Sequence, residues 1–431
     1  MKVSVVGLWH LGSVTAACLA DFGHKVTAID KNKDLINDFK SGILPIYEPG
    51  LDKLTKKYFD NGGISYSSKF SDIKNSDVVW VTYDTPVDDD DNADVEFVEN
   101  QMKDLMNYIN PSGTLIISSQ MPIESTSKLK NYITKNHPNY NIKLAYSPEN
   151  LRLGNAINVF TNPDRVIVGV FEEDTKNIIE ELLNKIKNKI IWMSVPSAEM
   201  TKHAINSFLA LSVTFINELS SFCELTGADA SEVEIGLKSE NRIGPKSYLK
   251  PGPAFAGGTL ARDLKFLVSK ANELNINSTL FEAALKSNDQ HKNWIKNKLI
   301  TLYKNLDDIK ITVLGLTYKP NTSTLRRSLS VELCNWLISK NIEISVFDPK
   351  IKLPPKELKG KFNFFDNLNN DLFKTDVIVL FNECEEFLEI DFDLIYKTNS
   401  DVRIIDPNGF LYKSKIKTIN KFNYYKIGKS N

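Results

Sequence analysis

The sequence lacks the side-chain patterns of a metalloprotein or of a disulfide-linked secreted protein. Its 431 residues include four cysteines, none in a CxxC pair, and five histidines that never fall at metal-ligand spacing. We therefore expect no metal site. The thiols are interpreted as reduced side chains packed as small apolar groups in a cytoplasmic protein. They are Cys18, Cys223, Cys334 and Cys384.

The sequence also lacks an excess of charge and any long apolar run. Lys and Arg number 53 against 54 Asp and Glu, a net charge of -1, so neither nucleic acid nor a membrane is expected as a partner. No stretch approaches the roughly 18 consecutive apolar residues of a transmembrane helix. Segment 1–7 reads as a strand that enters a glycine turn, so we expect no secretory leader. The acidic run Asp88–Asp91 lacks the spacing of a calcium loop and is interpreted as solvated.

What the sequence does contain is an alternation of strand-like and helical segments. Segments 3–6 and 25–29 are β-rich, and the Ala/Leu-rich stretch between them, 14–22, has a helical pattern. This order predicts a βαβ unit with parallel strands. Further strand-like runs lie at 78–81, 115–117 and 166–168.

A different pattern follows from residue 197. Residues 197–226 contain no Pro or Gly and carry apolar side chains at helical spacing. They predict one long helix with Ser197 as its N-cap and Gly227 at its end. A helix of this length suits a spine between two domains or a dimer interface.

The strand–turn–helix pattern starts again at residue 309, with strand-like runs at 311–314, 344–347, 377–380 and 402–405. The predicted fold is therefore α/β, with two Rossmann-like doubly wound parallel-sheet domains joined by a long central helix. We assign 1–196 to the first sheet domain, 197–300 to a central helical region and 301–431 to the second sheet domain.

The turn Gly7-Leu8-Trp9-His10-Leu11-Gly12 lies where a dinucleotide-binding fingerprint belongs, between a strand and a helix. Gly7 would form the tight turn and Gly12 would let the helix and strand pack closely. The helix N-terminus would then receive a pyrophosphate. Trp9 stands where the fingerprint has its middle glycine.

Asp30 ends the second strand, where an acid hydrogen-bonds the adenosine ribose and repels a 2′-phosphate. NAD is therefore expected in preference to NADP. Lys31 follows directly and weakens this preference slightly.

Five ordered blocks of sequence resemble the UDP-glucose/GDP-mannose dehydrogenase family over essentially the whole chain. The first reads LPIYEPGL and the fourth contains GGTLARD. The blocks are 44–51, 146–152 with 163–169, 202–218 with 227–229, 242–263, and 314–322 with Arg326.

This resemblance implies an NAD-dependent oxidoreductase. Members of the family oxidise the primary alcohol at carbon 6 of a nucleotide sugar, as UDP-glucose 6-dehydrogenase does for polysaccharide precursors. Two hydrides pass in succession to two NAD molecules. The family fold has two Rossmann-like domains and a long central helix, through which two copies usually form a homodimer.

The resemblance also implies a set of catalytic residues. Lys202 and Asn206 are one turn apart on the predicted helix and share a face, where they would stabilise an alkoxide at carbon 6. Asp263 matches the family aspartate that acts with this lysine on a water or on the sugar hydroxyl. Glu149 matches an acid proposed as base for the hydrolytic step.

Other positions match residues that hold the two ligands. Arginine forks suit phosphate, and structural ion pairing is the alternative for each arginine. The implied substrate residues are Arg152, Arg242, Tyr248, Gly257 and Lys319. The implied cofactor residues, besides the glycine turn and Asp30, are Thr85, Gln120, Arg262 and Arg326.

The chain departs from the family at the position of its cysteine nucleophile, where Thr259 stands. A hydroxyl is far less acidic than a thiol and would need a strong adjacent base. The preferred interpretation is a dehydrogenase without a covalent intermediate that yields an aldehyde or a uronate. The alternatives are an oxidoreductase acting at another position or on another anionic substrate, and a non-catalytic nucleotide-sugar-binding homologue.

Overall fold

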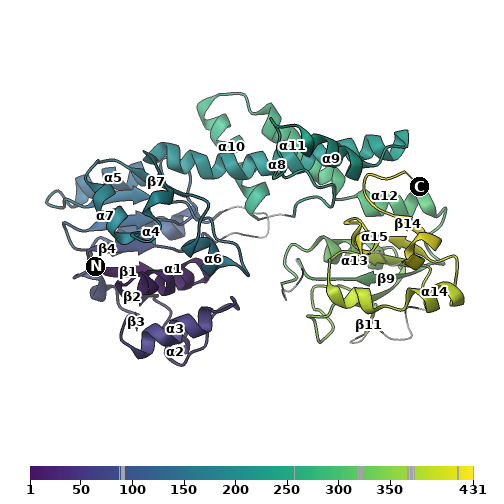
Figure 1. The fold of residues 1–431 in the computed structure, drawn as a ribbon, viewed down its shortest axis with the longest axis horizontal. Coiled ribbons are helices and arrows are strands. Elements are labelled where there is room, and N and C mark those ends of the chain that lie inside the picture. The colour runs from purple at the N-terminus through teal and green to yellow at the C-terminus, as the bar shows by residue number, and fades with distance from the viewer. Residues whose placement is uncertain are drawn as a thin grey trace. The chain divides into compact units, whose positions relative to one another are not determined.

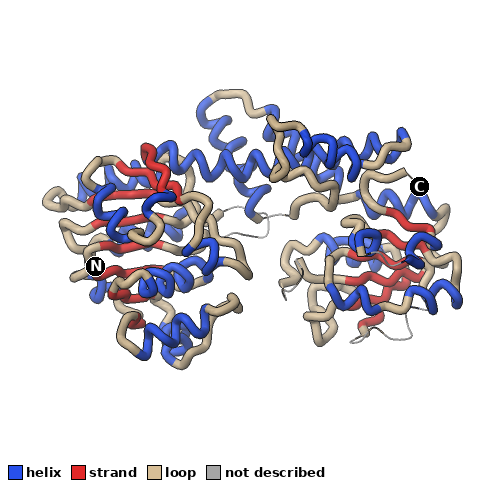
Figure 2. Tube along the Cα trace, viewed as in Figure 1, coloured by secondary structure: helices blue, strands red, loops and turns tan. Residues whose placement is uncertain are grey.

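The computed structural model describes most of the 431 residues and divides the chain into two compact units, Met1–Ile205 and Asn206–Asn431 (Figures 1 and 2). Two predicted substrate residues, Gly257 and Lys319, and positions 89–91 of the acidic run lie outside the described residues. The described residues are 1–86, 88, 93–256, 258–318, 320, 322, 324–365, 368, 372, 374–414 and 417–430.

The first unit contains an eight-stranded sheet with the order β3-β2-β1-β4-β5-β6-β7-β8. Neighbouring strands are parallel except β6 and β7, which are antiparallel. The order of the first six strands is that of a Rossmann fold. The strands are β1 Lys2–Val6, β2 Lys25–Ile29, β3 Ile64–Ser67, β4 Val78–Val81, β5 Thr114–Ile117, β6 Lys143–Tyr146, β7 Val166–Val170 and β8 Ile190–Ser194.

Both faces of this sheet are covered by helices, so its central strands are apolar throughout. Along β4, Val78 and Trp80 join one core while Val79 and Val81 join the other, because successive side chains point to opposite faces. One core includes side chains of α1 (His10–Asp21), α2 (Lys33–Lys40), α3 (Leu51–Asp60), α6 (Ala156–Thr161) and α7 (Thr175–Leu182). The other includes η1 (Phe70–Ile73), α4 (Val95–Leu105) and α5 (Ser125–Asn136).

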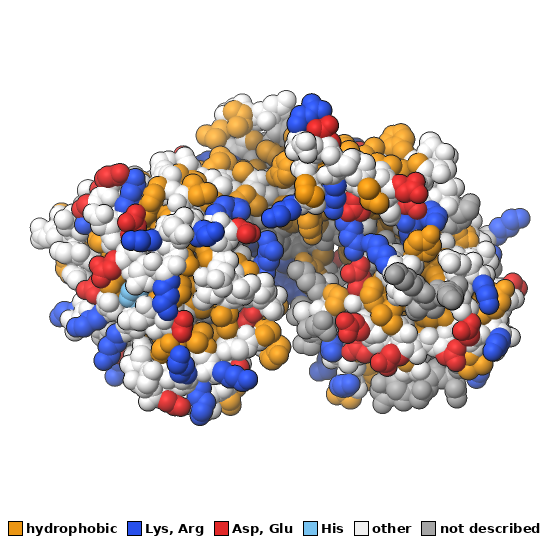
Figure 3. Space-filling view, in the orientation of Figure 1, with side chains coloured by type: hydrophobic (Ala, Val, Ile, Leu, Met, Phe, Trp, Pro, Cys, Tyr) orange, Lys and Arg blue, Asp and Glu red, His pale blue; other side chains and the backbone are white. Residues whose placement is uncertain are grey.

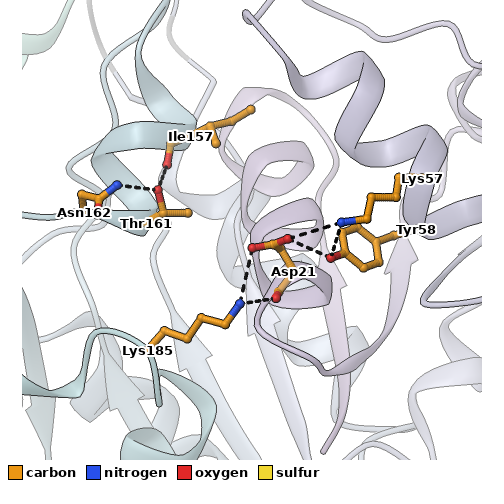
Figure 4. Close-up of polar contacts among 7 residues, drawn as sticks. All are labelled: Asp21, Lys57, Tyr58, Ile157, Thr161, Asn162 and Lys185. Atoms are coloured by element: carbon orange, nitrogen blue, oxygen red, sulfur yellow. Dashed lines mark hydrogen bonds and ion pairs between the residues drawn. The ribbon is translucent and has the colours of Figure 1, made fainter.

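A polar cluster ties the C-terminal end of α1 to its neighbours (Figure 4). The Tyr58 hydroxyl donates to the Asp21 carboxylate at 2.7 Å, and Lys185 Nζ donates to the Asp21 backbone oxygen at 2.5 Å. Lys57 Nζ lies 4.0 Å from the same carboxylate. The Tyr58 hydrogen bond and the two lysines lower the pKa of Asp21. The cluster holds α1 at the end opposite to the glycine turn.

The long predicted helix is present as α8, Val195–Thr226, and the unit boundary falls within it. The prediction of Ser197 as its N-cap was wrong. Ser194 precedes the helix, and its Oγ accepts the Ser197 backbone N–H at 3.3 Å, which is the capping bond. Pro196 lies in the first turn of α8, where proline is tolerated because its missing N–H would have no partner within the helix.

Among the described residues, α8 is the one helix long and apolar enough by length and composition to cross a membrane. Several of its buried polar side chains have partners within the protein. Glu199 accepts hydrogen bonds from the backbone of Glu124 and Thr126, and Asn217 accepts one from Gly252. These bonds join the buried side of α8 to neighbouring segments of the protein.

The second unit begins with helices and ends with a six-stranded parallel sheet of order β11-β10-β9-β12-β13-β14. This is again a Rossmann order, which confirms the second predicted sheet. The helices are α9 Ala230–Ser239, α10 Thr259–Leu274, α11 Thr279–His291, α12 Trp294–Leu302, α13 Leu329–Ser339, α14 Phe392–Thr398 and α15 Phe410–Lys413. The strands are β9 Lys310–Leu314, β10 Glu343–Phe347, β11 Asn363–Phe364, β12 Val377–Leu380, β13 Arg403–Ile405 and β14 Asn423–Tyr425.

Candidate active site

The glycine turn of the first unit lies where the sheet reverses its winding direction, since β1 pairs with both β2 and β4. Gly7 has φ +95°, a conformation that side chains with a Cβ rarely adopt. A Cβ at Gly12 would lie 1.9 Å from the Gly7 carbonyl oxygen. Both glycines therefore allow a close approach of α1 to the strand ends, in the packing role expected for them.

The turn suits a dinucleotide pyrophosphate. Trp9 is the N-cap residue of α1, and no side chain caps this helix end, so its first N–H groups are available to an anion. The indole of Trp9 is 47% exposed. His10 begins the helix, Leu8 and Leu11 are buried, and the cradle between the two glycines has no room for a further side chain.

Asp30 lies at the end of β2 beside this cradle. Its carboxylate accepts the backbone N–H groups of Leu8 and Asn32, each at 2.9 Å. Thr85 and Gln120 follow β4 and β5, and the Thr85 hydroxyl donates to the Gln120 carbonyl at 2.6 Å. The structure thus gathers four groups of predicted cofactor residues at the carboxyl ends of neighbouring parallel strands, where Rossmann folds bind ligands.

Two predicted catalytic residues meet in the first unit. The Lys202 ammonium on α8 donates to the Glu149 backbone oxygen at 2.6 Å and lies 3.6 Å from the Glu149 carboxylate. The two side chains are 12% and 30% exposed. A lysine held in this way can supply positive charge to a reacting oxygen while the acid remains open to a water molecule.

Two further predicted catalytic residues meet in the second unit. Asn206 lies one turn after Lys202 on α8, and its amide donates directly to the Asp263 carboxylate. Both side chains are buried. Thr259 is the exposed first residue of α10, one turn before Asp263, so the two share a helix face.

A buried acid that sequence reasoning did not single out joins three loops of the first unit. The Glu48 carboxylate is 2% exposed and lies 2.9 Å from His10 Nε2. It also accepts the backbone N–H groups of Gly154 and Ala156, each at 2.8 Å. Glu48 thereby connects the start of α1 to the loop that follows Glu149. The sequence feature that could have pointed to Glu48 is that it is the one acidic residue in the LPIYEPGL block.

The loop before α10 is fixed by side chains that sequence reasoning also missed. The Asn288 side chain exchanges two hydrogen bonds with the Phe255 backbone, at 2.9 and 2.8 Å. Asn217 accepts the Gly252 N–H at 3.2 Å, and His291 Nε2 lies 3.0 Å from the Gly252 oxygen. These contacts hold the backbone that leads to Thr259.

The other predicted ligand residues lie in several segments of the chain. Arg152 is exposed, and Tyr248 is 57% exposed. Arg242 is exposed and pairs with Glu240, with Nε 3.1 Å from the carboxylate, as the ion-pairing alternative allowed. Arg262 lies on α10, and Arg326 is exposed before α13.

The second sheet repeats the construction of the first. Gly315 follows β9 with φ +90°, and a Cβ there would lie 3.0 Å from the backbone nitrogen of Asn382. Asp348 ends β10 and accepts the N–H groups of Leu316 and Thr317 at 2.7 and 2.9 Å. A pocket opens beside this turn, lined by Pro253, Thr317, Tyr318, Pro320, Ser328, Leu329, Ser330, Phe381, Asn382, Glu383 and Asn408.

No native cysteine is placed to act as a nucleophile. All four are buried and free, which agrees with the expected packing of reduced thiols. Burial raises the pKa of Cys18, Cys334 and Cys384 to about 12. Burial also raises the pKa of Cys223. A thiol in this state supplies little thiolate at neutral pH.

Three family models match consecutive parts of the chain. The NAD binding domain of the UDP-glucose/GDP-mannose dehydrogenase family matches residues 1–187, its central domain 196–290 and its UDP binding domain 312–413. The chain belongs to the UDP-glucose/GDP-mannose dehydrogenase family. It is an NAD-dependent oxidoreductase of the nucleotide-sugar dehydrogenase type, and the glycine turn lies within its NAD binding domain.

Relatives of this dehydrogenase match along most of its length. A UDP-glucose 6-dehydrogenase of Rickettsia bellii is 29% identical over 435 residues, which cover 99% of each chain. UDP-glucose 6-dehydrogenase YwqF of Bacillus subtilis is 30% identical over 81% of this chain and 80% of its own. The structure of a UDP-glucose dehydrogenase from Pyrobaculum islandicum has the same fold, with a TM-score of 0.86 and 22% identity over 100% of this chain and 98% of that one.

Proposed function

We propose that this dehydrogenase oxidises the primary alcohol at carbon 6 of a nucleotide sugar without a covalent enzyme intermediate. The observation that carries this proposal is the environment of Thr259. It begins α10 one turn before Asp263, and Asp263 is hydrogen-bonded to Asn206. The neighbouring family residues are present while the thiol is not, and the native cysteines are buried.

The first oxidation removes a hydride from carbon 6 and a proton from its hydroxyl, which leaves an aldehyde. Bound NAD supplies the hydride acceptor. The Lys202 ammonium and the Asn206 amide stabilise the alkoxide oxygen as the hydroxyl proton leaves. Asp263 is the carboxylate that receives this proton, directly or through a water molecule.

The second oxidation requires a tetrahedral carbon 6. Without a thiol, water must add to the aldehyde to form a hydrate, and Glu149 takes the proton that this water loses. Loss of a second hydride from the hydrate to a second NAD gives the carboxylate. One NADH for each sugar indicates that the reaction ends at the aldehyde, and two indicate that the hydrate is oxidised.

Each of the two sheets binds one ligand in this proposal, at the turn that follows its first strand. Residues 1–196 hold NAD, 197–300 form the dimerisation region with the substrate loop, and 301–431 hold the nucleotide sugar. Support comes from the pocket beside Gly315, which opens at the carboxyl end of β9, where Rossmann-type sheets bind ligands. Arg152, Arg242, Tyr248, Gly257 and Lys319 are the proposed substrate residues.

The test is NADH formation with a panel of UDP- and GDP-sugars, with the mass of each product recorded. We expect Asp263→Asn to lower kcat at least about 100-fold, because the proton acceptor is lost. Asp289→Asn on α11, an exposed acid paired with Lys292, is the matched control and keeps its activity.

Each negative result identifies one alternative. Binding of a nucleotide sugar without turnover would support the non-catalytic homologue. A product oxidised at another carbon would support the different-position oxidoreductase.

We further propose a cytoplasmic homodimer formed through α8. Phe208, Phe215 and Phe222 recur every seven residues on this helix and are 67%, 49% and 67% exposed, so they form one apolar stripe. Figure 3 shows hydrophobic side chains at the surface over the group of helices that includes α8. Large exposed apolar patches are typical of protein interfaces.

A further inference from the structure

Asp30, Lys31 and Asn32 form the turn between β2 and α2, and each makes a different set of contacts. Asp30 is fixed by the backbone N–H groups of Leu8 and Asn32. Asn32 caps α2, because its side chain accepts the N–H groups of Asp34 and Leu35 at 3.0 and 3.2 Å. The backbone of Lys31 is therefore fixed on both sides, and only its side chain is free to reorient.

The Lys31 side chain is directed to α4. Its ammonium lies 2.6 Å from the Asp104 carboxylate and 4.5 Å above the centre of the Phe70 ring. The two charged side chains are 47% and 42% exposed, so the ion pair contributes a modest energy. Lys31, which is next to Asp30 in the chain, is therefore already paired with a negative charge.

Asp104 lies near the ribose end of the cradle, because its carboxylate is 2.6 Å from the ammonium of Lys31, the residue that follows Asp30. Tyr83 lies close to the same cradle. This residue follows β4, and a Cβ on Gly7 would lie 2.7 Å from its ring. Burial raises the pKa of Tyr83, and the carboxylates of Asp30 and Asp104 raise it further. Both acids therefore act on the same phenol.

Recognition of NADP in Rossmann folds requires a cation that pairs with the 2′-phosphate next to the ribose. We propose that Asp104 is a specificity-determining residue that holds Lys31 away from this position and so disfavours NADP. Asp30 cannot be altered cleanly because its carboxylate also supports the glycine turn. Asp104 is the charge that can be removed without changing the turn.

This inference rests on NAD binding at the Gly7–Gly12 turn. The experiment is a fluorescence titration of the full-length protein with NADH and with NADPH, which needs no sugar substrate. We expect Asp104→Asn to lower the Kd of NADPH about fivefold, a size set by the modest energy of exposed ion pairs. The Kd of NADH should change less than about twofold, because NADH has no 2′-phosphate.

A double-mutant cycle tests whether Lys31 carries the effect. Lys31→Met alone should change the NADPH affinity little, because the ammonium is held by Asp104, whereas Lys31→Met with Asp104→Asn should lose the gain. The gain should also shrink as salt rises from about 0.05 M to about 0.5 M. Thermal unfolding of each variant confirms that it is folded.

The opposing outcomes are distinct. A gain in NADPH affinity that persists without Lys31, or an equal change for NADH and NADPH, would contradict the role of the ion pair. Failure of the wild-type protein to bind NADH would contradict the dehydrogenase function itself, and with it this inference.

Discussion

Thr259 is the residue at which we propose that the chemistry of this dehydrogenase differs from that of its family. It begins α10, and helix N-termini lower the pKa of a thiol placed there. The same position does little for a hydroxyl, whose pKa is far above neutrality. Our proposal of oxidation through a hydrate rests on this threonine and on the burial of all four cysteines.

Restoring the thiol should restore covalent chemistry. We expect Thr259→Cys to speed formation of the carboxylate by about tenfold relative to the aldehyde, measured as the second NADH released for each sugar. Mass spectrometry after brief alkylation should find the new cysteine modified and the four buried cysteines unmodified. Thr259→Ser is the matched control, and an equal effect of serine would show that nucleophilicity at this position is not limiting.

Contacts between residues that are far apart in the chain could not be predicted from sequence patterns. Lys202 and Glu149 are 53 residues apart, and Glu48 and Gly154 are 106 apart. Periodicity is a local signal and contains no information on such pairs. The family resemblance proposed the first pair by role. It gave no reason to expect that Glu48 would accept two backbone N–H groups.

Elements in the middle of each sheet were predicted well because they are buried on both faces. β4 and β12 have the predicted bounds, and both are fully buried. Two of the missed strands, β8 and β11, lie at the edges of their sheets. β8 has four apolar residues in succession but is half-buried or exposed along its length, and β11 has only two residues. An edge position and a short length both depart from the pattern of a strand that is buried on both faces.

The C-terminal segment fastens to the end of α8 through contacts that no sequence pattern indicated. The Gly428 oxygen accepts the Ala230 N–H at 2.7 Å, and its N–H donates to Glu224 at 3.0 Å. Trp294 and Lys298 of α12 also donate to Glu224, at 2.8 and 3.1 Å. These bonds connect α8, α9, α12 and β14 within the second unit.

Gly428→Ala tests this connection. Its φ is +78°, and a Cβ there would lie 2.3 Å from the Ala230 Cβ. We expect the free energy of unfolding to fall by about 2 to 4 kcal/mol from strain and overpacking. Gly236→Ala in α9 is the control, because its Cβ would meet nothing within 4 Å, and it should stabilise the helix by about 1 kcal/mol. Urea denaturation measures both, and equal effects would exclude a special role for Gly428.

On the scale of the whole molecule, two histidines make stability depend on pH. Burial lowers the pKa of His24 and of His291, so both favour the neutral form when folded. The unfolded chain then binds more protons between the folded and unfolded pKa values. Stability should be complete above about pH 6.5 and should fall as the pH drops through the lowered values. Denaturation free energies across this range should flatten in the variant with both His24→Gln and His291→Gln.

The oligomeric state is a property of the whole molecule that the exposed stripe of α8 allows us to predict. Phe215 lies in the middle of the exposed stripe of α8, and a charge buried at the centre of an apolar interface is costly. We expect Phe215→Glu to convert the proposed dimer to a monomer in sedimentation-velocity measurements. Leu353→Glu is the control, because Leu353 is 76% exposed but lies in a loop of the second sheet domain. Loss of the dimer in both variants would place the interface elsewhere, and a wild-type monomer would contradict the proposal, because the stripe would then be exposed without a second copy.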